Sequence, residues 1–120
     1  MPKRKAKKRA PKHKPRQTVS AKLPPNAVTL IVMLRPKLGQ ETLLEAELRA
    51  LVAPTRREEG CLTYDLHRAT DPPGAFLLHE VWATREYHRL HKQTPHFLRW
   101  DARKDALLAA RDVTFWSYIT

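Results

Sequence analysis

The stretch CLTYDLHRATDPPGAFLLHEVW, residues 61–82, decides the fold of this chain. Its first part, Cys61–Arg68, alternates apolar and polar side chains with the period of two that is typical of a half-buried strand. Asp71-Pro72-Pro73-Gly74 has the composition of a turn, and Ala75–Trp82 is a second run of strand-forming residues. The two runs therefore predict a β-hairpin, whose second strand places four side chains on one face: Phe76, Leu78, Glu80 and Trp82.

Upstream of this hairpin, the hydrophobic pattern changes from that of a strand to that of a helix. Ala27–Leu34 reads AVTLIVML, and such a nearly continuous apolar run predicts a strand that is covered on both faces. After Gly39, apolar residues recur with helical spacing at Leu44, Leu48, Leu51 and Val52. Pro54 is expected to end or kink this helix, because proline lacks an amide hydrogen for the helical ladder.

Downstream of the hairpin, the pattern predicts further helix and a last strand. Thr84 is a suitable N-cap for a helix that begins at Arg85, and Thr94-Pro95 interrupts it and starts a new helical segment. The helical stripe continues to Leu107 and Leu108, and Val113–Ile119 reads as a strand. The resulting order β-α-β-β-α-β predicts an α+β, ferredoxin-like fold, in which an antiparallel four-stranded sheet carries both helices on one face.

This topology leaves one face of the sheet uncovered by the chain itself. The first strand is apolar on both faces, so its second face needs a cover that excludes water. The simplest cover is a second copy of the same sheet. We therefore expect a homodimer that forms a dimeric α/β barrel.

Charge divides the chain into two parts. Of 23 Lys and Arg residues against 12 Asp and Glu, ten basic residues and no acidic ones fall in residues 1–25, which leaves the body, residues 26–120, with a net charge of +1. The proline-rich first part cannot bury enough apolar surface to fold, so we expect residues 1–25 to be a disordered basic tail. The body has no charge excess for a nucleic-acid-binding fold.

The basic tail has two interpretations. It is either a solvated extension or an arm that binds nucleic acid or another polyanion by counterion release. The candidate polyanion-binding residues are Lys3, Arg4, Lys5, Lys7, Lys8 and Arg9.

Several classes of protein are excluded by composition. Cys61 is the only cysteine, which excludes a disulfide scaffold. No run of about 18 apolar residues is present, and the N-terminus lacks the apolar region of a secretory signal. We therefore expect a cytoplasmic protein that makes no contact with a membrane.

Three blocks of the body together resemble a known family. They are EEGCLTYDLHR (Glu58–Arg68), FLLHEVW (Phe76–Trp82) and HKQTPHF (His91–Phe97), and they occur in the order and at the spacing of the antibiotic biosynthesis monooxygenase (ABM) domain. The resemblance covers residues 27–120. The family that the chain resembles includes quinol monooxygenase-like members. It implies a dimeric barrel with a pocket between helices and sheet in each subunit. It also implies oxidation of a small aromatic, quinol-like substrate by O₂ without a metal or other cofactor.

His91 is the leading catalytic candidate. It lies on the inner stripe of the helix that follows the hairpin, and it matches the family's histidine before T-P-H-F. A phenolate gives an electron to O₂ far more readily than a phenol, and a neutral histidine can take the phenol's proton near neutral pH. The alternative is a structural histidine that packs beside Leu90 and bonds a carboxylate.

Glu80 and Trp82 match the family's E-x-W block. A Glu among apolar neighbours must be paired or neutral. It is either a second catalytic residue that holds His91 in one tautomer or a structural partner of an arginine. Trp82 is either core or a stacking surface for the substrate. The further residues expected at the substrate pocket are Tyr64, Phe97 and His96.

Two other functions stay open. A catalytically idle dimeric barrel could use its basic tails to bind nucleic acid, and a haem-degrading monooxygenase could use Trp82 and His91. The haem-degrading proteins that this fold resembles use a set of three residues, Asn, Trp and His. In this chain the nearest asparagine, Asn26, precedes the first strand. No metal site is expected, because the histidines lack zinc-binding spacing.

Overall fold

The computed structural model describes residues 23–120, so the candidate polyanion-binding residues, numbers 3–9, lie outside the described residues. Four strands and three helices make up the described part. They are β1 (Val28–Pro36), α2 (Glu41–Arg56), β2 (Cys61–Thr70), β3 (Pro73–Trp82), α3 (Arg85–His91), α4 (Pro95–Leu107) and β4 (Leu108–Trp116). This order confirms the predicted β-α-β-β-α-β pattern, with the last helix divided at Thr94-Pro95.

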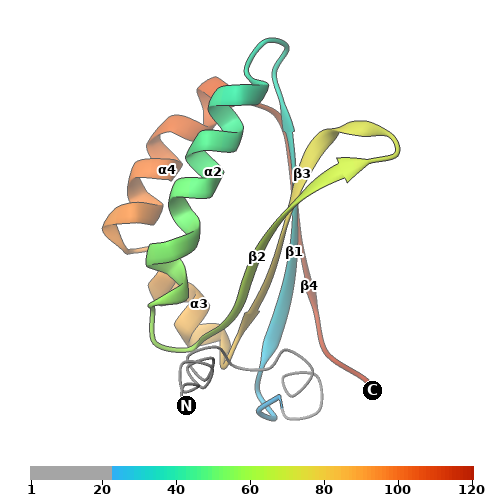
Figure 1. The fold of residues 1–120 in the computed structure, drawn as a ribbon. Helices are drawn as coiled ribbons and strands as arrows, with labels where there is room; N and C mark the ends of the chain where they lie inside the picture. Colours follow the sequence, from blue (N-terminus) through green and yellow to red (C-terminus); the bar gives the residue numbers. More distant parts are fainter. Residues whose placement is uncertain (1–22) are drawn as a thin grey trace, which may run out of the picture.

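The sheet has the strand order β2-β3-β1-β4, and each neighbouring pair is antiparallel. All three helices lie on one face of it, and the other face carries no helix (Figure 1). The fold is therefore α+β and ferredoxin-like, as predicted. The hairpin is also as predicted, with Arg68 opposite Phe76 and Thr70 opposite Pro73. Among the described residues, no helix is long and apolar enough to cross a membrane.

The last strand begins earlier than predicted. The sequence predicts helix through Leu108 and a strand over Val113–Ile119, whereas β4 starts at Leu108 and ends at Trp116. Ala109 and Ala110 favour helix by intrinsic propensity. Pairing with β1 overrides that preference, because β1 lies opposite β4 from Thr29 at Trp116 to Pro36 at Leu108, with one register shift between Arg35 and Pro36.

The core lies between α2 and the inner face of the sheet. Leu44, Leu48 and Leu51 are buried, as their helical spacing predicts. They pack against alternate residues of β1 and against Trp82 of β3, within one cluster.

Pro54 does not end α2, which continues to Arg56. On the outer face of β1, Met33 is 40% exposed.

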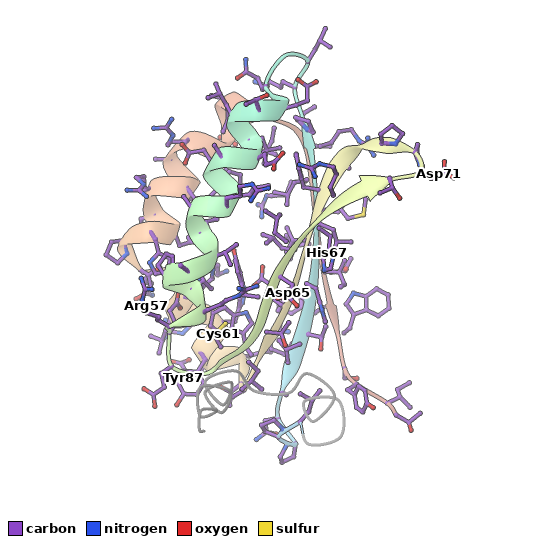
Figure 2. All side chains as sticks on the ribbon, in the orientation of Figure 1. Arg57, Cys61, Asp65, His67, Asp71 and Tyr87 are labelled. Atoms are coloured by element: carbon purple, nitrogen blue, oxygen red, sulfur yellow. The ribbon has the colours of Figure 1, made fainter. Side chains whose placement is uncertain are left out.

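The loop between α2 and β2 is held against α3 at Gly60. Gly60 has φ +84°, and a Cβ there would lie 2.1 Å from Cγ of Tyr87. The Ala83 amide donates a hydrogen bond of 2.8 Å to the Gly60 carbonyl. Arg57, Cys61 and Tyr87 all lie at this end of the sheet, far from the hairpin turn at Asp71 (Figure 2). The close approach therefore fixes residues 57–60 beside the start of α3.

We predict that Gly60→Ala destabilises the protein far more than Gly39→Ala. Both glycines have a positive φ, so both substitutions cost about 1–2 kcal/mol of backbone strain. Only at Gly60 does the added methyl collide with a side chain, since nothing lies within 4 Å of a Cβ at Gly39. Overpacking adds about 1–3 kcal/mol. Urea unfolding of the two variants measures the difference, and equal losses would contradict the Gly60–Tyr87 contact.

Candidate functional site

A cavity of about 540 Å³ lies between the inner face of the sheet and the helices α3 and α4. Its walls are largely apolar, and side chains of β1, β4 and α4 supply most of them: Leu30, Val32, Leu34, Phe97, Trp100, Val113 and Phe115. Tyr64, Glu80, His88 and His91 also line it. A mostly apolar cavity of this size with a few convergent polar groups is typical of a small-molecule site.

His91 lies at the last position of α3, just before the chain turns into α4. The Thr94 hydroxyl caps α4 by accepting from the Phe97 amide, and it also donates a 2.8 Å hydrogen bond to the His91 carbonyl. The His91 side chain is nearly fully buried, and its ring centroid lies 4.8 Å from that of Trp82 and 5.0 Å from that of Phe97. The break between the helices thus fixes the ring at the cavity wall.

Glu58 sets the tautomer of His91. Its Oε2 atom lies 2.8 Å from Nδ1 of His91, so Nδ1 carries the hydrogen and donates it. Burial lowers the pKa of His91, although Glu58 opposes this shift. Nε2 has no hydrogen-bond partner within the described part of the chain. His91 is therefore a neutral imidazole with an available basic nitrogen.

The carboxylate that orients His91 is thus Glu58 and not Glu80, for which the sequence left this role open beside that of a structural partner of an arginine. Glu58 lies in the loop that Gly60 packs against Tyr87, and the same Oε2 lies 2.5 Å from Nε2 of His96. Sequence reasoning missed it as a site residue, although it stands in the first of the three motif blocks. Only the fold shows that this loop meets the α3–α4 junction.

Glu80 has a different partner. It is 4% exposed, and the indole Nε1–H of Trp82 donates to its Oε1 at 2.9 Å. No arginine pairs with it among the described residues. Burial raises the pKa of Glu80 to about 7; the Trp82 hydrogen bond lowers it and the charge of Glu58 raises it further. Glu80 is therefore a proton donor poised near neutral pH, on the wall of the same cavity as His91.

The other expected pocket residues divide into two groups. Tyr64 and Phe97 line the cavity, and burial raises the pKa of Tyr64 well above its usual value, so its hydroxyl keeps its proton. Trp82 and His96 do not line it. Trp82 is fully buried behind Glu80 and His91, and His96 is turned toward Glu58. Trp82 therefore contacts the candidate acid and base, His96 contacts Glu58, and neither lines the space for a substrate.

His88 is a cavity residue that the sequence analysis did not place there. It stands one turn before His91, and its ring meets Phe115 edge-on with centroids 5.7 Å apart. Burial lowers the pKa of His88 to about 4, and the charge of Lys92 and contributions from His91 and Arg85 lower it further. It is therefore uncharged near neutral pH and adds to the aromatic wall.

The structure brings together the potential metal ligands Glu58, His91 and His96, whose ligand atoms all lie within 4.8 Å of one another. The spacing of histidines in the sequence did not predict this cluster. The separations from Glu58 Oε2, 2.8 and 2.5 Å, are those of hydrogen bonds. Ligands at 2.0–2.1 Å around one tetrahedral zinc would stand about 3.3 Å apart. We interpret the cluster as a hydrogen-bonded His–Glu–His arrangement.

Two further residues do not take part in the site. Asn26, the asparagine that the haem interpretation would require, lines a separate depression with Arg85 and Trp116. Cys61 is half-buried, and burial raises the pKa of its thiol to about 12, so it is not a nucleophile near neutral pH.

Comparison with known proteins agrees with this fold. The family model "Antibiotic biosynthesis monooxygenase" matches residues 27–103. The chain is 35% identical over 81 residues to the "Putative monooxygenase Rv0793" of Mycobacterium tuberculosis, which covers 68% of this chain and 79% of that protein. It is 32% identical over 79 residues to the "Putative monooxygenase YcnE" of Bacillus subtilis, covering 66% and 81%.

Solved structures show the same arrangement. The crystal structure of PA3566 from Pseudomonas aeruginosa superposes with a TM-score of 0.76 at 37% identity, covering 79% of this chain and 96% of that one. The structure of Rv0793 gives the same TM-score at 31% identity, covering 79% and 97%. The α+β, ferredoxin-like arrangement of this chain is thus shared with these proteins. The chain belongs to the antibiotic biosynthesis monooxygenase family.

We predict that Glu80 makes the protein less stable as the pH rises from about 4.5 to 7. The folded state holds the Glu80 proton more tightly than the unfolded chain, where the pKa is near 4.5, so folding loses this advantage above the unfolded value. His88 and His91, whose pKa values are lowered, act in the opposite direction. The contribution of Glu80 therefore has to be isolated with a variant.

Glu80→Gln provides that comparison, because glutamine keeps an oxygen for the Trp82 indole and cannot ionise. Between pH 5 and pH 8, the unfolding free energy of the natural protein should fall relative to that of the variant by about 2 kcal/mol. Urea unfolding at the two pH values measures this. Parallel pH dependence of the two proteins would show that Glu80 is ionised throughout.

Proposed function

We propose that this chain is a cofactor-independent monooxygenase, which uses O₂ to oxidise a small phenolic, quinol-like aromatic in the 540 Å³ cavity. One observation carries the proposal: a neutral base, His91, and a protonatable acid, Glu80, line the same apolar cavity. Their environments move their pKa values in opposite directions, down for His91 and up for Glu80. Such divergence is typical of acid and base pairs in active sites.

The first step is removal of the substrate's hydroxyl proton by Nε2 of His91. The imidazolium that forms keeps its hydrogen bond to Glu58, whose negative charge stabilises it at 2.8 Å. The phenolate that remains can transfer an electron to O₂. The rings of Trp82 and Phe97 pack against the His91 ring and exclude water from the faces that they cover.

The second step joins O₂ to a ring carbon that carries a hydrogen and lies next to or opposite the carbon that bears the oxygen. The ring-bound peroxide takes a proton from Glu80, and loss of the hydrogen on that carbon breaks the O–O bond and leaves a carbonyl. The hydroxide that departs carries the proton from Glu80 and takes the substrate's hydroxyl proton from His91, so it leaves as water, and the proton lost by the ring carbon returns to Glu80. One phenol and one O₂ thus give one quinone and one water, and the substrate supplies all the electrons.

We predict that His91→Ala lowers the rate of O₂ consumption per folded molecule by about 10² to 10⁴, the usual contribution of a positioned general base. The loss should shrink as the pH rises toward the substrate's own pKa, about 10 for a simple phenol, because solvent then supplies the phenolate. Oxygen-electrode rates over a range of quinols and pH values, with folded protein quantified by circular dichroism, measure both effects.

Glu58→Gln is the companion variant, because glutamine keeps an acceptor for Nδ1 but removes the charge that stabilises the imidazolium. It should slow turnover less than His91→Ala. A His91→Ala protein with unchanged rates would make His91 structural. Absence of O₂ consumption with every phenol would favour the non-catalytic barrel with basic arms.

The proposed active unit is a homodimer that pairs through the bare sheet face. That face carries Ile31 and Met33 of β1, and Trp116 on β4 is 57% exposed there, opposite Thr29. Exposed apolar surface on a sheet is a typical subunit contact. We predict a dimer mass by light scattering at micromolar concentration. Met33→Lys should shift it toward the monomer, whereas Leu38→Lys, on an exposed loop residue, should not; a monomeric natural protein would contradict the proposal.

A further inference from the structure

We propose that the preferred substrate is a phenol with an anionic group, a carboxylate, at the end of its ring system opposite the hydroxyl, and that Arg111 binds this group. The inference rests on the proposed function for the identity of the reacting end. It adds a second binding point in the same cavity, which neither the family nor the mechanism above assigns.

The cavity carries positive charge that its own acidic residues do not balance. Among its ionisable residues, His88 and His91 are uncharged near neutral pH, and Glu80 is held toward its neutral form. Asp101 lies 2.8 Å from Nζ of Lys104, which compensates its charge. Lys92 and Arg111 also line the cavity, and neither has a carboxylate partner among the described residues. The cavity therefore offers two cations and attracts an anionic ligand.

Arg111 stands away from the level of Glu80 along the sheet. Glu80 on β3 and Phe115 on β4 both stand opposite Leu30 of β1, whereas Arg111 stands opposite Leu34. Four residues of a strand span about 13 Å. Three alternate residues of β4 face the cavity: Arg111, Val113 and Phe115. Arg111 therefore lies at one end of the cavity, and Glu80 lies at the other end.

The reactive end of the cavity lies at the level of Glu80. Tyr64 pairs with Glu80 across β2 and β3, and the ring of His91 lies 5.8 Å from that of Tyr64. Lys92 directly follows His91, so its charge stands at the end where a phenolate forms. Arg111 is the cation of the opposite end, and the apolar side chains of Val32 and Val113 lie between.

This arrangement matches an elongated aromatic acid. The hydroxyl would meet His91, the rings would lie against the aliphatic wall, and the carboxylate would reach Arg111. The guanidinium presents a planar fork of N–H groups that binds both carboxylate oxygens, which a lysine cannot do. A carboxylate next to the hydroxyl would be placed against Glu80 and away from Arg111. Recognition therefore depends on the position of the acid group as well as on its charge.

Anaerobic equilibrium binding tests the proposal without turnover. The probes are 6-hydroxy-2-naphthoate, with acid and hydroxyl at opposite ends, 3-hydroxy-2-naphthoate, with the two groups adjacent, and neutral 2-naphthol. Quenching of tryptophan fluorescence reports occupancy, since Trp100 lines the cavity. We expect 6-hydroxy-2-naphthoate to bind about tenfold more tightly than either other probe, the usual value of a charged hydrogen bond.

Arg111→Gln should remove this preference and leave the affinity for 2-naphthol unchanged. Arg111→Lys should retain part of it. Arg99→Gln, which removes an arginine of α4 outside the cavity, is the matched control and should behave like the natural protein. Equal affinities for the three probes, no binding of any probe, or a preference that survives in Arg111→Gln would each overturn the proposal.

Oxygen consumption with the same probes separates this inference from the proposed function. Selective binding through Arg111 without O₂ uptake would leave the anion subsite standing and contradict the monooxygenase. O₂ uptake that depends neither on the carboxylate of the probe nor on Arg111 would support the monooxygenase and contradict the anion subsite.

Discussion

The hydrogen bond between Glu58 and His91 is the interaction on which the site depends. It joins the loop after α2 to the end of α3, and the contact of the same carboxylate with His96 extends it to the first turn of α4. Three segments that are separate in the sequence thus meet at one oxygen atom. Gly60 makes this meeting possible, because only a residue without a side chain lets the loop approach Tyr87 so closely.

The two polar groups of the cavity differ because their surroundings differ. His91 and Glu80 are both buried, and burial disfavours the charged form of each. For a histidine that means loss of a proton, and for a glutamate it means retention of one. The same apolar enclosure therefore prepares a base and an acid together, with Trp82 packed on the His91 ring and bonded to Glu80. In the proposed binding mode, Arg111 at the far end of the cavity fixes the orientation of an aromatic acid, so that its hydroxyl end faces His91 and Glu80.

The elements with strong hydrophobic periodicity follow from the sequence. The alternation in residues 61–82 predicts the hairpin, and the spacing of Leu44, Leu48 and Leu51 predicts the buried stripe of α2, because both patterns depend only on local backbone geometry. Local propensity failed at the start of β4. There, two alanines favour helix, and pairing with β1 decides otherwise. Non-local hydrogen bonding of this kind leaves no period in the strand's own sequence.

The site shows the same division. The sequence by itself placed His91 on the inner stripe of the helix after the hairpin and Glu80 on one face of a strand, because helical spacing and the period of two follow from local backbone geometry. It did not determine their partners. Only the tertiary structure decided that Glu58 bonds His91, that Trp82 bonds Glu80, and that Arg111 lines the cavity four strand residues from the level of Glu80. Hydrogen-bond partners and charge balance depend on distances between residues far apart in the chain, and these are fixed when the layers pack.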